Sequence, residues 1–270
     1  MLDPTRFRVT PGSAVSLSAF DPDSKEGFEG GKTEGEAALP DLNHRLAELQ
    51  SRLWAESKHR LLVVLQAMDT GGKDGTIRHV FKGANPQGIE VRSFGPPTEQ
   101  ELAHDYLWRV HPHVPGNGAM TIFNRSHYED VLVVRVRELV PEDRWRRRYQ
   151  HINDFERLLT DEGTTIVKLF LHISREEQRA RLQARLDDPS KRWKFRAGDL
   201  EDRKLWDPYQ TAYEEAITRT STENAPWYVV PANRKWYRNL VVSNILIETL
   251  EKLDPRFPEP ETDLDGLVVV

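Results

Sequence analysis

Short apolar runs alternate with longer amphipathic segments along most of the chain. Leu61 to Leu65 form a continuous apolar run, which is typical of a strand buried on both faces of a parallel sheet. Similar runs recur at residues 89–94, 119–123, 165–173 and 227–230, and each gap between them is long enough for a helix. Strands that alternate with helices indicate a layered α/β fold. We therefore predict a three-layer α/β/α fold built on a five-stranded parallel sheet.

The region before the first apolar run divides at residue 40. Residues 1–40 show little periodicity and contain a Gly-rich acidic stretch, so we predict an extended leader and loop that ends at Pro40. Beyond it, apolar side chains recur at helical spacing, at Leu42, Leu46, Leu49 and Leu53. We predict a helix over 41–58 with Asp41 as its N-cap, and we divide the chain into an N-terminal extension, 1–40, and one domain, 41–270.

Three further helices are marked by their local sequence. Ser174 with Glu177 matches a capping box, which places a helix start after Ser174. Asp207 followed by Pro208 predicts a helix whose first residue is the proline. One helical face is shared by Trp145, Tyr149, Ile152 and Leu159. These signals predict that helices exist in these regions, and they fix the boundaries less well.

Composition narrows the class of protein. The chain has 270 residues, with 38 Lys and Arg against 43 Asp and Glu, a formal net charge of -5 and no cysteine. A net negative charge argues against a whole-surface binder of nucleic acid or membrane, so any polyanion site must come from local basic clusters. The lack of cysteine excludes disulfides, thiolate chemistry and Cys-ligated zinc. No apolar run approaches the roughly 20 residues that span a bilayer, and we expect a cytoplasmic protein.

A glycine-rich turn directly follows the first apolar strand. It reads Ala67-Met68-Asp69-Thr70-Gly71-Gly72-Lys73-Asp74-Gly75-Thr76 and leads into a segment, 77–81, that suits a helix. Such a turn points successive backbone N–H groups at phosphate oxygens, and the helix N-terminus adds a favourable dipole. Lys73 would neutralise phosphate charge, and the candidate phosphate contacts beside it are Thr70, Gly71, Gly72, Asp74, Gly75 and Thr76.

The turn is a degenerate P-loop. Ala67 stands where the motif has its first glycine, and Asp74 replaces the hydroxyl residue that binds magnesium. An ordinary Gly-rich connection with a solvated lysine would have a similar sequence. The position between a strand and a helix favours the phosphate-binding interpretation, because the mechanism requires that placement.

With these residues in view, the sequence resembles the family-2 polyphosphate kinases. Their phosphate loop carries an Asp three residues before a Gly-Lys pair, as Asp69 does here. Similar segments follow in order: 123–130 (FNRSHYED) after the central strand, 191–195 (KRWKF) in the lid, 207–209 (DPY) and 225–232 (APWYVVPA). The resemblance covers most of residues 40–255, and it implies a P-loop kinase fold with a helical lid at 175–204.

Polar residues after the strands supply candidate catalytic groups. Asp69 would organise Mg²⁺ or orient the attacking phosphate, because a carboxylate beside bound polyphosphate is stable only with a cation present. Arg125 would neutralise the phosphate in transfer at the end of a central strand. Asn124 stands where many family members have Asp, and this form resembles class III, whose members phosphorylate both AMP and ADP. Glu129 and Asp130 would face the acceptor nucleotide or a metal, or else solvent, and both interpretations stay open.

Basic residues are concentrated in the expected lid. Arg181 and Arg185 are one helical turn apart and precede a turn that contains Lys191, Arg192 and Lys194. Phosphoryl transfer leaves little covalent chemistry for the protein, so positive groups delivered by a closing lid supply much of the stabilisation. The resemblance implies that Arg185 is the catalytic lid arginine, with Lys191, Arg192 and Lys194 as polyphosphate or nucleotide contacts.

Two other clusters have weaker claims to a function. Arg144, Arg146, Arg147 and Arg148 would line a polyphosphate channel or form a solvated helix face, and both remain open. His104, His111 and His113 lack the spacing and the nearby carboxylate of a transition-metal site.

The combined pattern predicts a polyphosphate-dependent nucleotide kinase that uses Mg²⁺ and transfers phosphoryl groups between inorganic polyphosphate and AMP or ADP. Adenine nucleotides are the expected partners, with guanine nucleotides left open. An ATP-dependent kinase of a nucleoside monophosphate or small metabolite would share the loop and lid, and a non-catalytic nucleotide-binding or nucleic-acid-binding module would share the loop alone. Family members commonly form dimers or tetramers, and Trp236 and Tyr237, expected to be exposed, are compatible with a homo-oligomer.

Overall fold

The computed structural model describes residues 2–260 and contains the predicted parallel sheet. Its strands lie in the order β2-β3-β1-β4-β5, and every neighbouring pair is parallel. The bounds are β1, Arg60–Gln66; β2, Ile89–Ser93; β3, Met120–Asn124; β4, Thr164–His172; and β5, Trp227–Pro231. The five predicted apolar runs are therefore confirmed as strands. The side chains of Leu61 to Leu65 are completely buried, as expected for a strand covered on both faces.

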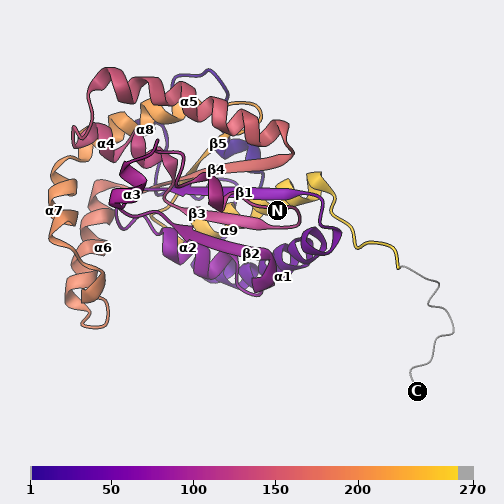
Figure 1. Cartoon of the computed structure of the whole chain (residues 1–270). Coiled ribbons are helices and arrows are strands. Elements are labelled where there is room, and N and C mark those ends of the chain that lie inside the picture. Colours follow the sequence, from indigo (N-terminus) through magenta and orange to yellow (C-terminus); the bar gives the residue numbers. More distant parts are fainter. Residues whose placement is uncertain (1, 261–270) are drawn as a thin grey trace.

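Helices cover both faces of the sheet, which confirms the three-layer architecture (Figure 1). One face carries α5 and α8, and the other carries α1, α2 and α9. The helices are α1, Lys32–Glu56; α2, Lys73–Val80; α3, Glu99–Leu102; α4, Val133–Val136; α5, Glu142–Asp161; α6, Arg175–Asp187; α7, Ala197–Lys204; α8, Trp206–Thr220; and α9, Lys235–Leu253. Helices α6 and α7 project together from the body at one end of the sheet (Figure 1).

Strand register brings polar residues from distant parts of the sequence to one edge of the sheet. Leu65 of β1 lies opposite Asn124 of β3 on one side and Leu169 of β4 on the other. The chain leaves β1 and β3 at the same edge, because the carboxyl ends of parallel strands coincide. The phosphate loop after Gln66 and the segment after Asn124 therefore start side by side.

The first helix starts earlier than predicted. It begins at Lys32, so the prediction of a helix over 41–58 with Asp41 as N-cap was wrong, and a break at residue 40 would fall inside α1. Gly31 is the N-cap, and its backbone N–H donates to Glu34 Oε2 at 2.8 Å. Within the helix, a Cβ on Gly35 would lie 2.2 Å from Trp236 Cε3. Part of the Gly-rich stretch therefore serves close helix packing, not a loop.

The remaining helix predictions are largely confirmed. Helix α5 contains the predicted apolar face, and α6 begins after Ser174, whose Oγ accepts a hydrogen bond from Glu177 N at 3.1 Å. The second half of that capping box is absent, because Ser174 N donates to Asn233 Oδ1 instead. Helix α8 begins at Trp206, so Pro208 is its third residue and not its first, as had been predicted.

Two aromatic side chains on α9 were wrongly expected to be exposed. Trp236 is 8% exposed and Tyr237 is completely buried. Trp236 packs against Gly35 and the ring of Phe28, and Tyr237 packs against Phe7. The N-terminal segment thus covers α9, and these aromatics cannot form an oligomer interface.

A buried ion pair lies in the core at β4. Lys168 Nζ lies 2.5 Å from Glu156 Oε2, and both side chains are almost completely inaccessible. The same ammonium group donates to Tyr128 Oη at 2.9 Å and to Thr220 O at 2.6 Å. The ammonium group therefore has three oxygen partners, which offset its loss of hydration.

Replacing Lys168 by methionine is expected to lower the free energy of unfolding by about 3–5 kcal/mol, because the buried carboxylate of Glu156 would lose its ammonium partner and keep only its contacts with Tyr128 and His127. Urea unfolding measures the change. The double variant Lys168→Met/Glu156→Gln is expected to recover much of the loss, because it removes the stranded charge. A single variant as stable as the original protein would contradict this account.

No helix in the described part of the chain is both long enough and apolar enough to cross a lipid bilayer.

Candidate active site

The backbone of the predicted phosphate loop is shaped by its glycines. Gly72 has a φ of 103°, which favours glycine, and Thr70 has a φ of 63°. A Cβ on Gly71 would lie 2.4 Å from the Cβ of Ala67, so the turn cannot accept a larger residue there without moving. The first helical bond of α2 runs from Thr76 N to Gly72 O at 2.9 Å. The amides that precede Thr76 in α2 are free of helical partners and available to an anion.

Lys73 is the first residue of α2 and points back into the loop. Its side chain is buried, and Nζ donates to Ala67 O at 3.0 Å. Burial, and then the nearby Arg125, lower the pKa of Lys73 to about 8, although Asp69 and Glu129 act in the opposite direction. A bound phosphate would supply the negative charge that this ammonium group lacks.

The lowered pKa of Lys73 predicts weaker phosphate binding at alkaline pH. Because the ammonium group loses its proton as pH rises through about 8, affinity for tripolyphosphate is expected to fall by up to about tenfold between pH 7 and pH 9, relative to a Lys73→Arg variant that stays charged. Calorimetric titration of both proteins at both pH values measures the ratio. The ligand's own charge changes equally for the two proteins, so a constant ratio would contradict the prediction.

Asp69 and Arg125 form an ion pair across two neighbouring strand ends. Arg125 Nη2 lies 2.9 Å from Asp69 Oδ1, and the two side chains are 40% and 21% exposed. Arg125 follows β3 directly with a φ of 63°, and its backbone N–H donates to Leu65 O at 3.1 Å. Burial alone would lower the pKa of Arg125, but Glu129 and Asp69 raise it, so the guanidinium remains charged. A constrained backbone thus holds a partly exposed cation beside the loop.

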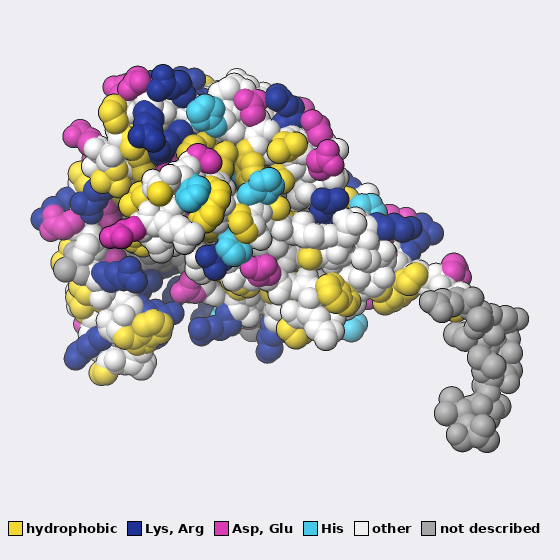
Figure 2. All heavy atoms as spheres, in the orientation of Figure 1, with side chains coloured by type: hydrophobic (Ala, Val, Ile, Leu, Met, Phe, Trp, Pro, Cys, Tyr) yellow, Lys and Arg dark blue, Asp and Glu magenta, His cyan; other side chains and the backbone are white. Residues whose placement is uncertain are grey.

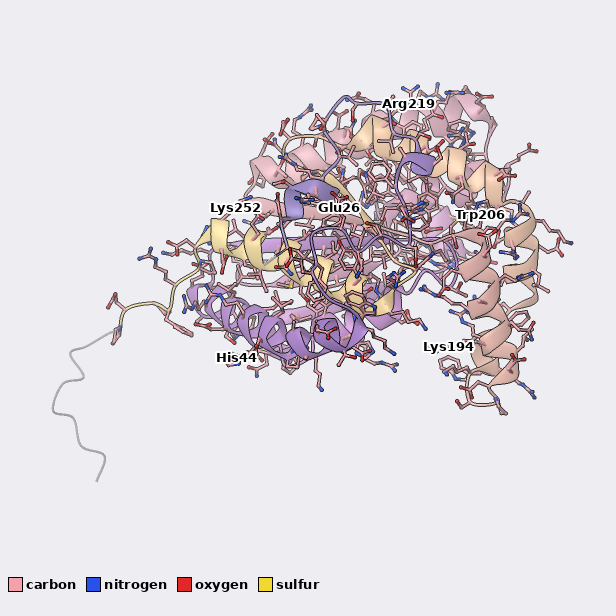
Figure 3. The ribbon with its side chains drawn as sticks, turned by 180° about the vertical axis from the view of Figure 1, so that it is seen from behind. Glu26, His44, Lys194, Trp206, Arg219 and Lys252 are labelled. Carbon is pink, nitrogen blue, oxygen red and sulfur yellow. The ribbon has the colours of Figure 1, made fainter. Side chains whose placement is uncertain are left out.

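Asp74 connects the loop to β3 and to the lid. Its Oδ1 accepts a hydrogen bond from Asn124 Nδ2 at 2.9 Å, and its Oδ2 lies 3.5 Å from Lys194 Nζ. Asn124 and Asp74, both predicted site residues, are therefore in direct contact. Lys194 belongs to the projection formed by α6 and α7, on the side that faces the body (Figure 3).

Glu129 lies behind the ion pair, and Asp130 lies further from the loop. Burial raises the pKa of Glu129, whereas Arg125 and Lys73 lower it. With its amide turned, Gln66 donates to Glu129 Oε1 at 3.1 Å. Asp130 pairs with Arg148 at 2.8 Å, and burial raises the pKa of Asp130 to about 6. Neither carboxylate is simply solvent-facing.

Of the arginine cluster that includes Arg148, two members pair on the helix surface. Arg146 lies 2.6 Å from Glu142, and Arg147 lies 3.2 Å from Asp143. These pairs favour the solvated-face interpretation for Arg146 and Arg147.

The segment predicted to form a lid, residues 175–204, brings a second set of charges near the loop. Arg185 Nη1 of α6 lies 3.6 Å from Asp199 Oδ2 of α7. Burial raises the pKa of Asp199, and Asp69 raises it further, whereas Arg185 and Arg125 lower it. Asp199 thus lies within electrostatic range of both the lid arginine and the Asp69–Arg125 pair. Figure 2 shows the hollow between the projection and the body, with Lys and Arg side chains around it.

Other predicted contacts do not reach the loop directly. Lys191 Nζ pairs with Asp188 at 2.5 Å, and Arg192 Nε donates to Leu186 O at 2.8 Å, so both contact residues of the segment 175–204 itself.

The two threonines of the loop have buried hydroxyl groups. Thr76 is completely buried, and its Oγ1 donates to Gly72 O at 3.1 Å. Thr70 Oγ1 is buried and has no hydrogen-bond partner among the described residues.

Three residues that fix the loop or face it were not predicted from the sequence to do so, although Arg181 was named among the basic residues of the lid. Gln178 Nε2 donates to Asp69 O at 3.2 Å, and Arg181 Nη1 donates to Thr70 O at 3.0 Å. Arg181 also donates to Ala232 O at 2.6 Å. Asp199 is the third. The i,i+4 pair of Glu177 and Arg181 was visible in the sequence, but contacts that span more than 100 residues leave no local signal.

The carboxylates suit a cation that arrives with its ligand. The described residues contain no cluster of three or more His, Cys, Asp or Glu that would hold a metal by itself. Magnesium is usually bound by one or two carboxylates, substrate phosphates and water. Asp69, which is partly exposed beside the loop amides, fits that mode.

Comparison with known proteins gives consistent matches. The family model described as Polyphosphate kinase 2 matches residues 29–258. An AMP/ADP-polyphosphate phosphotransferase of Meiothermus ruber is 64% identical, over 98% of this chain and 99% of that protein. An ADP-polyphosphate phosphotransferase of Rhodopseudomonas palustris is 45% identical, over 94% of this chain and 92% of that protein. The crystal structure of polyphosphate kinase 2 from Arthrobacter aurescens superposes with a TM-score of 0.93 at 48% identity, covering 97% of this chain and 94% of that one.

Proposed function

Because this chain belongs to the polyphosphate kinase 2 family, we propose that it transfers phosphoryl groups between inorganic polyphosphate and AMP or ADP, forming ADP or ATP. One observation carries the proposal: charged lid residues face the phosphate loop from the opposite side of the hollow. Lys194 contacts Asp74, and Arg185 pairs with Asp199 near the Asp69–Arg125 pair. Such a cationic enclosure is what phosphoryl transfer requires, because the transition state spreads negative charge over the phosphate oxygens.

In the proposed reaction, a terminal phosphate oxygen of the nucleotide attacks the terminal phosphorus of polyphosphate in line. A new P–O bond forms as the bond to the next phosphate breaks, and the electron pair leaves on the shortened polyphosphate. Lys73 and the loop amides hold phosphate oxygens, and Arg125 and Arg185 offset the charge that develops. No side-chain base is needed, since a nucleotide phosphate is largely deprotonated near neutral pH.

Magnesium is part of the proposal. Asp69, together with the phosphates and water, would hold Mg²⁺, which when bound would offset phosphate charge. The partial exposure of Asp69 and its position beside the loop support this role. Asn124 is neutral and already donates to Asp74, so it is the poorer ligand for a hard cation.

Both AMP and ADP are proposed as acceptors. The Meiothermus ruber relative, an AMP/ADP-polyphosphate phosphotransferase, supports this choice. We propose that Asn124, which contacts Asp74 of the loop, and Glu129, whose pKa is influenced by Arg125 and Lys73, contact the acceptor. Adenine nucleotides are the proposed substrates, and guanine nucleotides are a secondary test.

The lid at 175–204 is proposed to close over the phosphates, with the contact between Lys194 and Asp74 as the link of its outer part to the loop. We further propose a cytoplasmic homo-oligomer, either a dimer or a tetramer. Light scattering after size-exclusion chromatography tests the assembly, and a single monomeric species at micromolar concentration would reject it.

One assay separates this function from its rivals. Purified protein is incubated with Mg²⁺, long-chain polyphosphate and either AMP or ADP. We expect ADP and ATP to form, and chromatography measures both products. Turnover of AMP with ATP as the only effective donor would favour an ATP-dependent kinase. Salt-sensitive binding of nucleic acid without any turnover would favour a binding module.

A further inference from the structure

A buried arginine on α9 lies directly behind the phosphate loop. Arg238 is 1% exposed. A Cβ built on Gly72 would lie 2.0 Å from Arg238 Nη1, and one built on Gly75 would lie 3.4 Å from Nη2. The guanidinium therefore packs against the turn through which the chain enters α2. Gly72 is required here for this close approach as well as for its positive φ.

This arginine has no carboxylate partner within the described residues. It donates only to Asn239 Oδ1, from Nε at 3.2 Å and from Nη2 at 2.7 Å. Burial and the neighbouring Arg181 both lower the pKa of Arg238, and no acidic group counteracts them. Two buried cations away from the loop differ from Arg238, since Lys168 is paired with Glu156 and Arg148 with Asp130.

An uncompensated guanidinium at this place is unfavourable in the empty protein. The N-terminus of α2 already carries the positive end of a helix dipole, and Lys73 and Arg181 add charge nearby. A buried charge without a partner costs several kcal/mol in general, and apolar replacements of buried charges are often neutral or stabilising. A phosphate chain bound on the open side of the loop would supply the missing negative charge.

We propose that Arg238 is a positioning residue that holds positive charge behind Gly72–Gly75 and thereby strengthens the grip of the loop on bound phosphates. It touches no substrate, and it acts through the loop amides and through the electric field. The proposal rests on the phosphate-binding role of the loop in the proposed function. It accounts for both the missing carboxylate and the glycine required at residue 72.

The test compares thermal unfolding of Arg238→Met with and without two ligands, long-chain polyphosphate and ADP. The variant is expected to unfold at the same or a higher temperature than the original protein when empty. Its ligand-induced rise in unfolding temperature is expected to shrink, and KM for polyphosphate is expected to rise by about tenfold with a smaller change in kcat. A lower unfolding temperature in the empty variant, with an unchanged ligand-induced shift, would overturn the proposal.

Two further variants make the result specific. Arg238→Gln is neutral but retains an amide donor for Asn239, so it decides the question if the methionine variant does not fold. Arg135→Met is the matched control, because Arg135 is also largely buried but pairs with Glu215 at 2.6 Å. It is expected to lose stability and keep the full ligand-induced shift. If the original protein fails to turn over polyphosphate, the proposed function fails, and the ADP comparison still decides the role of Arg238.

Discussion

Replacing Lys73 by methionine is expected to lower the rate of polyphosphate-dependent ADP and ATP formation by about a thousandfold while the protein stays folded. Lys73 Nζ is buried, and among the described residues it donates only to Ala67 O. In the empty loop the variant therefore loses a single hydrogen bond to a neutral acceptor. Methionine fills a similar volume without the charge. In the loaded enzyme the lost group is the cation that the phosphates would contact. Initial rates with AMP and polyphosphate, together with a thermal unfolding curve, measure both effects.

The matched control for Lys73 is Lys82, an exposed lysine that follows α2. Lys82→Met removes the same charge from the same part of the chain, and its rate is expected to stay within about twofold, as for a solvent-screened charge. A Lys73→Met variant that keeps most of its activity would remove this lysine from the mechanism.

The sheet was predictable because each strand is buried on both faces. A strand in that environment must be apolar at consecutive positions, and the run from Leu61 to Leu65 meets this condition without reference to any other segment. The phosphate loop was predictable for a similar reason, since its glycines are needed locally, between one strand and one helix. The meeting of Asp69 with Arg125 then follows from parallel pairing of β1 with β3.

The start of α1 was not predictable from local sequence. Gly35 and Pro40 both disfavour a helix interior, yet the helix continues through them. The compensation is tertiary, because Gly35 leaves room for the ring of Trp236, which is 201 positions away in the sequence. The same contact buries Trp236, so both errors came from a single long-range packing interaction.

The basic segment that is predicted to form the lid was visible in the sequence, but the contact partners of its residues were not. Three basic residues lie close together in the sequence, at Lys191, Arg192 and Lys194. Of these three, only Lys194 contacts Asp74. Asp199 carries no sequence signal of its own, since acids are common on solvated helix faces. Its importance appears only when α7 lies beside α6 and brings it near Asp69.

The two lid arginines one turn apart have different surroundings. Arg181 is 8% exposed and donates to three backbone carbonyls, of Thr70, Ala232 and Asn233. The side chain of Arg185 is 25% exposed, and its one polar contact among the described residues is the 3.6 Å contact with Asp199. Arg181 therefore stabilises the loop through its hydrogen bonds, whereas Arg185 has fewer contacts to break before it turns toward a bound phosphate.

This difference predicts a separation of activity from stability. Arg185→Met is expected to lower kcat by about a thousandfold with an unchanged unfolding temperature, because the variant loses charge that is needed only in the transition state. Arg181→Met is expected to lower the unfolding temperature by several degrees, because buried carbonyls of Thr70 and Ala232 lose their donor. Steady-state kinetics and thermal unfolding of both variants provide the comparison.

Arg179 offers the control on the same helix, since it is exposed. Arg179→Met is expected to leave both kcat and the unfolding temperature unchanged, because its charge is screened by solvent. If Arg185→Met retained its kcat while Arg181→Met lost activity without losing stability, the catalytic arginine of the lid would be Arg181, one helical turn before Arg185. The contact between Arg185 and Asp199 would then only join α6 to α7, and closure of the lid would have to act through Lys194 instead.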